Sequence, residues 1–412
     1  MKPSASKRHV ALGVIGLALA AGVGACDARI VDPGPVSDES LDQPVANAAI
    51  VNGMAKALSR ALGYISYTGA AISREVVASG SMALFGITVR QRAGVLDPAT
   101  SETNDHWQFA QQARWVAEDG VRRMRLTLGD KFGTSALAAE ALVYVGYSNR
   151  LLGENMCDGV IDDGPIESRT VYFTRAQAAF SEAITVAVAA GNQKLELAAR
   201  AGRASVRVWL GDWPGAMADA KLVPSSFIHQ AKYTTADLDQ YNRIYWANGN
   251  QPYRAHSEVG TFYESYYLTY NDPRTPWKKN PAIPTGTMPT VPWYFQTKFD
   301  KRESPVNLAS GHEMRLIIAE SLLRSGDWEG ALTAINQLRS EVGVIPWTAT
   351  NSTEAWVALK RERGIELWLE GRRLGDLGRW LADKTPGAVE DMTGRNTCFP
   401  IGQTEREANP NF

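Results

Sequence analysis

Apolar residues recur every three or four positions over most of the chain, which is the spacing of one face of an α-helix. From 44 to about 80 this period predicts one amphipathic helix and then a second segment through Ile72 and Val76. Another helix is expected to begin near Asn104 or Asp105, whose side chains cap helices well. The period continues over 134–152, 174–191, 193–210, 214–222, 311–325, 327–341 and 353–382. Because little of the chain alternates as a strand does, the pattern predicts a mainly α fold.

A short motif occurs twice at the junctions between these predicted helices. Residues 211–216 and 326–331 share the pattern G-D-W-x-G-A, 115 positions apart, and amphipathic stretches flank each copy. In a tetratricopeptide unit, glycine ends the first helix, an acidic residue caps the second, an aromatic residue fills the seam, and alanine allows close helix packing. A third unit can be drawn over 138–142 and 176–184, with residues 153–173 inserted between its helices. The repeats predict a superhelix of tetratricopeptide-like helical pairs.

The helical period breaks between 223 and 308, where aromatic residues and proline concentrate. Residues 241–299 contain 14 aromatics among 59 residues, against about five expected from the chain's 9% aromatic content. Sugar rings stack on Trp and Tyr, so aromatics beside polar residues or proline are ligand-binding candidates. The candidates are Trp246, Tyr263, Tyr267, Trp277, Trp293 and Tyr294. The run from Phe262 to Tyr270 also has helical spacing, so packing in the core is the alternative for its aromatics.

The N-terminus has the pattern of an exported, lipidated protein. Basic residues precede an apolar run from Val10 to Ala21 that is too short to span a bilayer. Val23-Gly24-Ala25-Cys26 then resembles a lipobox, which predicts a signal peptide over 1–25 and lipid attachment to Cys26. An ordinary secretory signal with a chance cysteine is the alternative. The acidic segment 26–43 contains two prolines and is expected to be a flexible tether.

The remaining cysteines point to a cross-link. If Cys26 carries lipid, Cys157 and Cys398 are left, which is an even number in an oxidising compartment. A disulfide between them would tie the C-terminal tail to the first half of the chain. Two free, buried thiols are the alternative.

Composition and motifs exclude several functions. The 43 basic and 44 acidic side chains leave a net charge of -1, which offers no basic field for nucleic acid. No nucleophile elbow, phosphate loop or dinucleotide motif is present, and the five His lack metal-site spacing, so no metal or cofactor is expected. Glu362, Glu366 and Glu370 would share a helix face, but interleaved arginines favour ion pairing over catalysis. The acidic loop 158–164 lacks the spacing of a calcium site.

The last third of the chain resembles the SusD/RagB family of outer-membrane nutrient-binding lipoproteins. The matching residues are 313–321 leading into Gly326-Asp327, the stretch from Arg361 to Trp380, and Phe399-Pro400-Ile401 with Asn409-Pro410. Asp272-Pro273-Arg274 matches more weakly. The resemblance implies one α-helical domain over 44–412, in which a variable segment at about 223–308 forms the ligand site.

The same resemblance implies a function and a location. Members are not enzymes; they sit lipid-anchored on the outer face of the outer membrane as lids of SusC-like TonB-dependent transporters. They bind glycans or, in some branches, peptides before import. The chain is therefore expected to capture a nutrient oligosaccharide and deliver it to such a transporter. A helical-repeat scaffold or a peptide-binding lipoprotein without glycan recognition is the alternative.

Overall fold

The computed structural model describes residues 38–80, 89–249 and 253–412. The chain forms two compact units, residues 1–41 and 42–412. In the first unit, the described residues form one short helix, α2 (Asp38–Leu41). The predicted signal peptide, the lipobox with Cys26 and most of the predicted tether lie outside the described residues.

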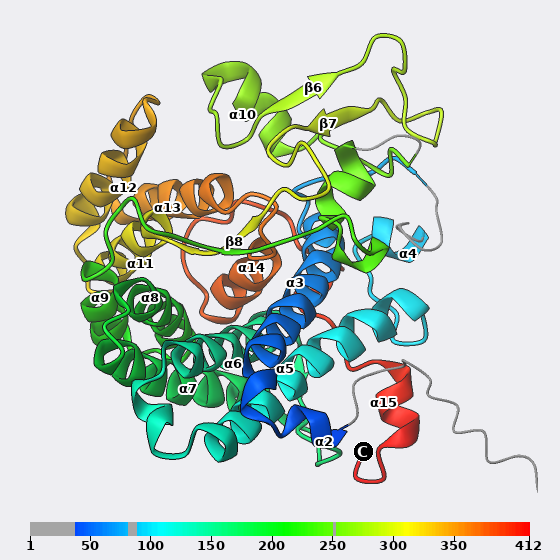
Figure 1. Ribbon diagram of the computed structural model, residues 1–412. Coiled ribbons are helices and arrows are strands. Elements are labelled where there is room, and N and C mark those ends of the chain that lie inside the picture. The colour runs from blue at the N-terminus through cyan, green and yellow to red at the C-terminus, as the bar shows by residue number, and fades with distance from the viewer. Residues whose placement is uncertain (1–37, 81–88, 250–252) are drawn as a thin grey trace, which may run out of the picture. The chain divides into compact units, whose positions relative to one another are not determined.

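The second unit is built mainly from helices that follow one another as neighbours (Figure 1). Its longer helices are α3 (Asn47–Ile72), α5 (Ser101–Leu128), α6 (Ala136–Asn155), α7 (Thr170–Ala189), α8 (Gln193–Trp209), α9 (Trp213–Lys221), α11 (Gly311–Arg324), α12 (Trp328–Val342), α13 (Ser352–Glu366) and α14 (Arg373–Ala382). Consecutive helices pack together from α5 to α9, α9 contacts α11, and the series continues through α12 and α13. The predicted mainly α fold of tetratricopeptide-like pairs is confirmed.

Both copies of the repeated motif act as predicted. Gly211 and Gly326 have φ of 74° and 90°, the left-handed conformation that glycine adopts most easily after a helix. The carboxylate of Asp212 accepts a hydrogen bond from the Gly215 amide at 3.0 Å, and that of Asp327 accepts one from the Gly330 amide at 2.8 Å. Each aspartate therefore caps the helix that follows it, α9 or α12.

Two predicted helix boundaries in the first half are wrong. The stretch from 44 to about 80 holds one continuous helix, α3, which ends at Ile72 before Arg74 turns to a φ of 63°. Helix α5 begins at Ser101, because the hydroxyl of Thr100 caps it by accepting a hydrogen bond from the Thr103 amide. The Asn104 side chain, the predicted cap, instead accepts a hydrogen bond from the Thr404 amide near the C-terminus.

The periodic stretch 353–382 is also divided. Helix α13 ends at Glu366, and the chain reverses through Leu369 and Gly371, whose φ angles are 62° and 73°. Helix α14 starts only at Arg373. Glu370 therefore lies in the turn, and the predicted helix face with three carboxylates does not exist.

Short antiparallel pairs are the β-structure of the described residues. They are β1 (Val77–Ala78) with β5 (His256–Ser257), β2 (Asp158–Gly159) with β3 (Glu167–Ser168), β4 (Ile228–Ala231) with β8 (Val306–Ser310), and β6 (Trp277–Lys279) with β7 (Tyr294–Gln296). The β2–β3 hairpin occupies the segment predicted to separate α6 from α7. Pairing of β4 with β8 joins the two ends of the aromatic-rich segment, which we call the insertion (residues 232–305). The insertion also contains α10 (Phe262–Tyr270) and lies beyond β8 at one end of the unit (Figure 1).

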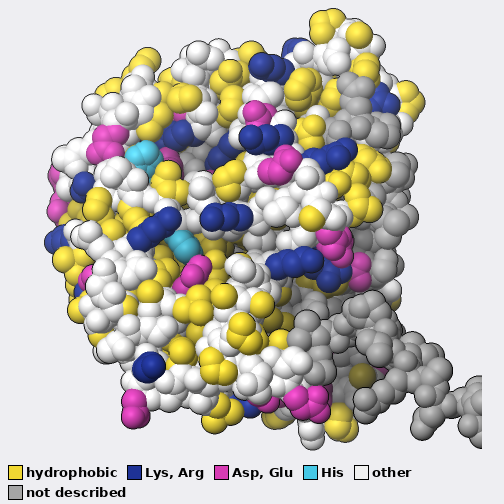
Figure 2. Space-filling model, in the orientation of Figure 1, with side chains coloured by type: hydrophobic (Ala, Val, Ile, Leu, Met, Phe, Trp, Pro, Cys, Tyr) yellow, Lys and Arg dark blue, Asp and Glu magenta, His cyan; other side chains and the backbone are white. Residues whose placement is uncertain are grey.

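Basic and acidic side chains are mixed on the surface, as the near-neutral composition predicts. On the face in Figure 2, Lys and Arg side chains lie beside Asp and Glu at several places. None of the helices in the described ranges has both the length and the hydropathy needed to cross a membrane.

Candidate ligand-binding site

The insertion is fastened to the last helices of the scaffold by buried ion pairs. Arg274, three residues before β6, contacts Glu362 at 2.7 Å and Glu366 at 3.0 Å, both on α13. Lys298, two residues after β7, donates to the Trp368 carbonyl at 2.8 Å and to Glu370 at 3.0 Å. These contacts hold the open end of the β6–β7 hairpin against α13 and the turn that follows it.

These carboxylates are ion-pair acceptors. Burial alone would raise the pKa of Glu366, but hydrogen bonds from His312 and Arg274 keep that pKa below its usual value. The pKa of Asp272 is lowered in the same way, because its hydrogen bonds and ion pair with Arg274 outweigh burial. Charge pairing was predicted from the interleaved sequence, but the partners lie outside the helix. Arg274 of the insertion pairs with both Glu362 and Glu366, and Arg339 of α12 is a second partner of Glu362.

An aromatic surface on the β6–β7 hairpin is the first candidate site. Trp277 and Tyr294 stack with ring centroids 5.0 Å apart and planes 11° apart, and Tyr267 of α10 lies 6.0 Å from Trp277. The ammonium group of Lys279 lies 4.2 Å from the centroid of Tyr294. Tyr267 and Tyr294 are half-buried, Lys279 is exposed, and Trp277 is 5% exposed. We call Tyr267, Lys279 and Tyr294 the hairpin surface; it offers two half-buried tyrosine rings beside a hydrogen-bond donor, and the buried Trp277 supports Tyr294 by stacking.

The other three aromatic candidates lie inside the insertion. Tyr263 is 1% exposed and stacks on Trp368, and Trp293 is 2% exposed and donates its indole N–H to the Asn248 carbonyl at 3.0 Å. Trp246 is buried between Tyr241 and Tyr253. The helical spacing of residues 262–270 explains Tyr263, because it places Tyr263 on the buried face of α10. These three rings are part of the packed interior of the insertion.

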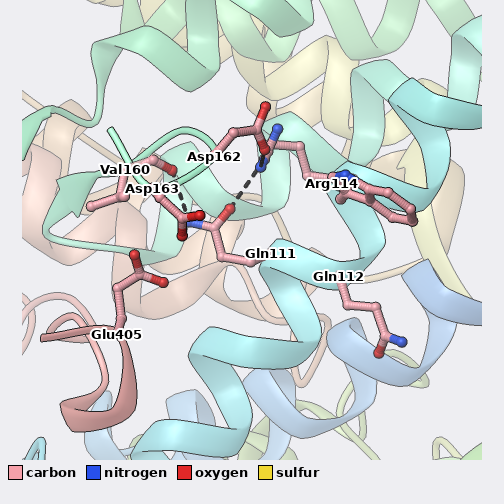
Figure 3. A pocket seen from close by; sticks show the side chains of 8 residues that line it. Gln111, Gln112, Arg114, Val160, Asp162, Asp163 and Glu405 are labelled. Atoms are coloured by element: carbon pink, nitrogen blue, oxygen red, sulfur yellow. Dashed lines mark hydrogen bonds and ion pairs between the residues drawn. The ribbon is translucent and has the colours of Figure 1, made fainter. Parts of the chain in front are cut away.

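The second candidate site is a hollow outside the insertion, which the sequence did not predict. It has a volume of about 370 Å³ and lies between α5, the loop after β2 and the helix α15 (Gln403–Ala408). Figure 3 shows Asp163 and Glu405 near Gln111, although the three come from different segments. We call it the α5 hollow; its lining residues are Gln111, Gln112, Arg114, Trp115, Val160, Asp162, Asp163 and Glu405.

Helix periodicity could have signalled this hollow. Trp107, Ala110, Ala113 and Ala117 are buried and form one stripe along α5. Trp115 lies off that stripe and is 53% exposed. An aromatic residue that departs from the apolar stripe is the available clue. Asp163 and Glu405, which line the hollow with Trp115, are 242 positions apart. The sequence alone therefore did not predict that they lie close together.

The C-terminal tail is joined covalently to the β2–β3 region. Cys157 and Cys398 form a disulfide across 241 positions, with Cα atoms 5.1 Å apart. The Cys157 amide also donates to the Phe399 carbonyl at 2.9 Å. Within the described ranges, no cluster of three or more His, Cys, Asp or Glu side chains could hold a metal ion.

The fold and the site define a class of protein: a superhelix of helical pairs that carries an irregular, aromatic-rich insertion between its repeats. The family model for the SusD family matches residues 205–411, which is half of the chain and includes the insertion. The chain therefore belongs to the SusD/RagB family, and the resemblance seen in the sequence is confirmed. No curated protein matches the chain.

Solved structures share this fold over nearly their whole length. A SusD-like carbohydrate-binding protein from Bacteroides vulgatus is 14% identical, with a TM-score of 0.66 over 90% of this chain and 97% of that one. A laminarin-binding SusD-like protein is 17% identical, with a TM-score of 0.67 over 90% of this chain and 100% of that one. A SusD superfamily protein from Parabacteroides distasonis is 13% identical, with a TM-score of 0.66, covering 92% and 98%. At these identities the likeness establishes the fold.

Proposed function

We propose that this protein is a non-catalytic surface lipoprotein that binds a nutrient oligosaccharide and passes it to a SusC-like TonB-dependent transporter in the outer membrane. The observation that carries the proposal is membership of the SusD family over residues 205–411. Neighbours with the same fold include a carbohydrate-binding and a laminarin-binding protein. The hairpin surface supports the choice of ligand, because sugar rings present C–H faces that stack on aromatic side chains.

The first experiment tests the ligand. The purified protein is screened on a glycan array and a peptide library, and laminarin oligosaccharides are titrated by calorimetry. We expect saccharide binding that Tyr294→Ala weakens about tenfold, because one stacking face is lost. Leu268→Ala on α10 removes a side chain that is 67% exposed and outside the hairpin surface, and it serves as the matched control. Peptide binding without glycan binding would favour the alternative scaffold function.

The second experiment tests the anchor and the partner. Mass spectrometry of the mature N-terminus should show loss of residues 1–25 and a lipid on Cys26, and Cys26→Ser should release the protein from membranes. Affinity purification from detergent-solubilised membranes should recover a large β-barrel transporter. Recovery of the chain alone, under conditions that keep membrane complexes intact, would count against delivery to a transporter.

A further inference from the structure

The α5 hollow has walls that are fixed by contacts between distant parts of the chain. The Cys157–Cys398 disulfide joins the residue just before β2 to the C-terminal segment that carries α15. Asn409 donates to the Gly164 carbonyl at 2.9 Å, and Asn411 donates to the Asp163 carbonyl at 2.8 Å. Several independent links thus set the distance between two of its walls.

The loop in one wall is held in an unusual conformation. Asp162 and Asp163 have φ of 47° and 58°, a left-handed conformation that few residues with a Cβ adopt, although Asp adopts it more easily than most. Arg114 forms an ion pair of 2.7 Å with the Asp162 carboxylate, and the Asn411 side chain donates a hydrogen bond to the Asp163 backbone carbonyl. Strained residues persist where their surroundings over-determine them, and they concentrate at binding sites.

An exposed indole borders the hollow. Trp115 is one helical turn after Gln111 on α5, so both side chains lie on the same side of the helix. The Trp115 side chain is 53% exposed, and the lining residues around it are mostly polar or charged. An apolar ring beside hydrogen-bonding groups suits a ligand with one apolar face and polar edges.

The charges in the hollow select against anions. Arg114 is already engaged by Glu118 and Asp162, each at 2.7 Å. The Glu405 carboxylate accepts one hydrogen bond at each oxygen, from Trp107 and Asn409, and a carboxylate oxygen can accept a further one. With the exposed Asp163 carboxylate beside it, the lining is acidic and rich in acceptors. Neutral hydroxyl groups, which donate hydrogen bonds, fit this lining.

We propose that the α5 hollow is a second saccharide-binding site, which takes one or two neutral sugar rings with Trp115 as the stacking face and Asp163 and Glu405 as hydroxyl acceptors. Its volume of about 370 Å³ falls within the range of small-molecule sites, about 300–1,000 Å³. The ligand class rests on the proposed function, but the position does not: α5 and α15 lie far from the β6–β7 hairpin (Figure 1). A chain with two sites would hold an oligosaccharide or a polymer at two points.

Fluorine NMR of protein labelled with 5-fluorotryptophan separates the two sites in one sample. The chain has 12 Trp residues, and Trp115→Phe and Trp277→Phe variants assign the two resonances of interest. The protein is kept in a detergent without a sugar headgroup and titrated with maltose, cellobiose and laminaribiose. We expect at least one disaccharide to shift the Trp115 resonance saturably, and Asp163→Asn to weaken that binding about tenfold. Galacturonic acid disaccharide should leave the resonance unchanged.

The following outcomes decide the proposal. A Trp115 resonance that no neutral disaccharide moves would overturn it, and so would equal affinity in wild type and Asp163→Asn. Leu126→Ala, at an exposed position of α5 outside the hollow, should leave the titration unchanged. A shift of the Trp115 resonance without a shift of the Trp277 resonance would support the α5 hollow and count against the hairpin surface. A shift of the Trp277 resonance alone would support the hairpin surface and overturn the α5 hollow.

Discussion

Buried titratable groups form ion pairs between the last helices of the scaffold, whereas the interior of the insertion also holds groups that burial keeps neutral. Where α11, α13 and α14 meet, buried charges are paired: Arg379 contacts Glu320 at 2.6 Å, and Arg363 contacts Asp376 at 2.9 Å. Although burial would raise the pKa of Asp376, the neighbouring arginines lower it to about 2, so the carboxylate stays ionised. In the insertion, burial lowers the pKa of His256 to about 3 and raises that of Glu258 well above its usual value, so both side chains are neutral.

This difference shows what each region depends on. The ion pairs of the scaffold join α11, α13 and α14 with directional contacts, so each partner requires the other. The insertion is organised by stacked rings and backbone hydrogen bonds, and ion pairs fasten it near Arg274 and Lys298. Stacked rings tolerate substitution better than buried ion pairs do, because losing one partner does not leave a buried charge. We therefore expect the aromatic side chains of the insertion to tolerate substitution without unfolding of the scaffold.

Breaking a scaffold ion pair should have the largest effect on stability. Arg379→Ala removes the two short ion-pair contacts of Glu320, which is fully buried, and leaves it only the longer ion pair with Arg324 at 3.4 Å. We expect a loss of about 3–5 kcal/mol in unfolding free energy. Urea denaturation followed by circular dichroism measures the loss. Arg125→Ala, which removes an exposed pair with Glu182, should cost less than about 1 kcal/mol. Tyr294→Ala in the insertion should also lower the unfolding free energy only slightly. A loss as large as that of Arg379→Ala would refute the claim that the aromatics of the insertion tolerate substitution better than the ion pairs of the scaffold.

Removing the disulfide should have the next largest effect. The double variant Cys157→Ser, Cys398→Ser frees a link across 241 positions, and we expect a loss of about 2–5 kcal/mol because the unfolded chain gains entropy. Denaturation with and without a reducing agent measures it. The reducing agent should destabilise the wild type and leave the double variant unchanged. Unchanged wild-type stability after complete reduction would show that the hydrogen bonds of the tail suffice.

Removing one helix cap should have a smaller effect. Asp212→Ala and Asp327→Ala each leave a helix amide without its side-chain acceptor, and each should cost about 1 kcal/mol. Asn at the same positions keeps an acceptor and should restore most of the stability. Since the two motifs have the same geometry, denaturation midpoints that move by very different amounts would show that the two repeats contribute unequally.

The smallest expected effect is a pH dependence at the edge of the scaffold. Hydrogen bonding to Glu366 raises the pKa of His312, which also lies 3.6 Å from Glu341. Its contribution to stability is therefore fully present below the unfolded pKa of about 6.5 and is lost as the pH rises through the folded pKa. The stability difference between wild type and His312→Gln should shrink with rising pH. A difference that grows from pH 6 to pH 9 would contradict this assignment.

Local patterns in the sequence were sufficient for the repeat architecture. Helical periodicity and the G-D-W-x-G-A motif depend on residues within one or two turns, so the caps at Asp212 and Asp327 could be predicted. The same reasoning misplaced the start of α5, because Thr100 and Asn104 both cap well and the contact of Asn104 with the Thr404 amide decides between them. It also missed the break after Glu366, because Leu369 adopts a left-handed conformation that its side chain does not favour.

What the sequence alone determined is the class of the protein: its helical period, its repeat motif and the concentration of aromatics in one segment are properties of neighbouring residues. Only the tertiary structure decided how far each of those aromatics is buried, because Tyr263 is buried and Tyr267 half-buried although they lie one helical turn apart on α10. It also decided which charges pair, since Arg274 reaches Glu362 across 88 positions. Contacts of that kind depend on how the helices pack, and the spacing of residues along the chain does not encode them locally.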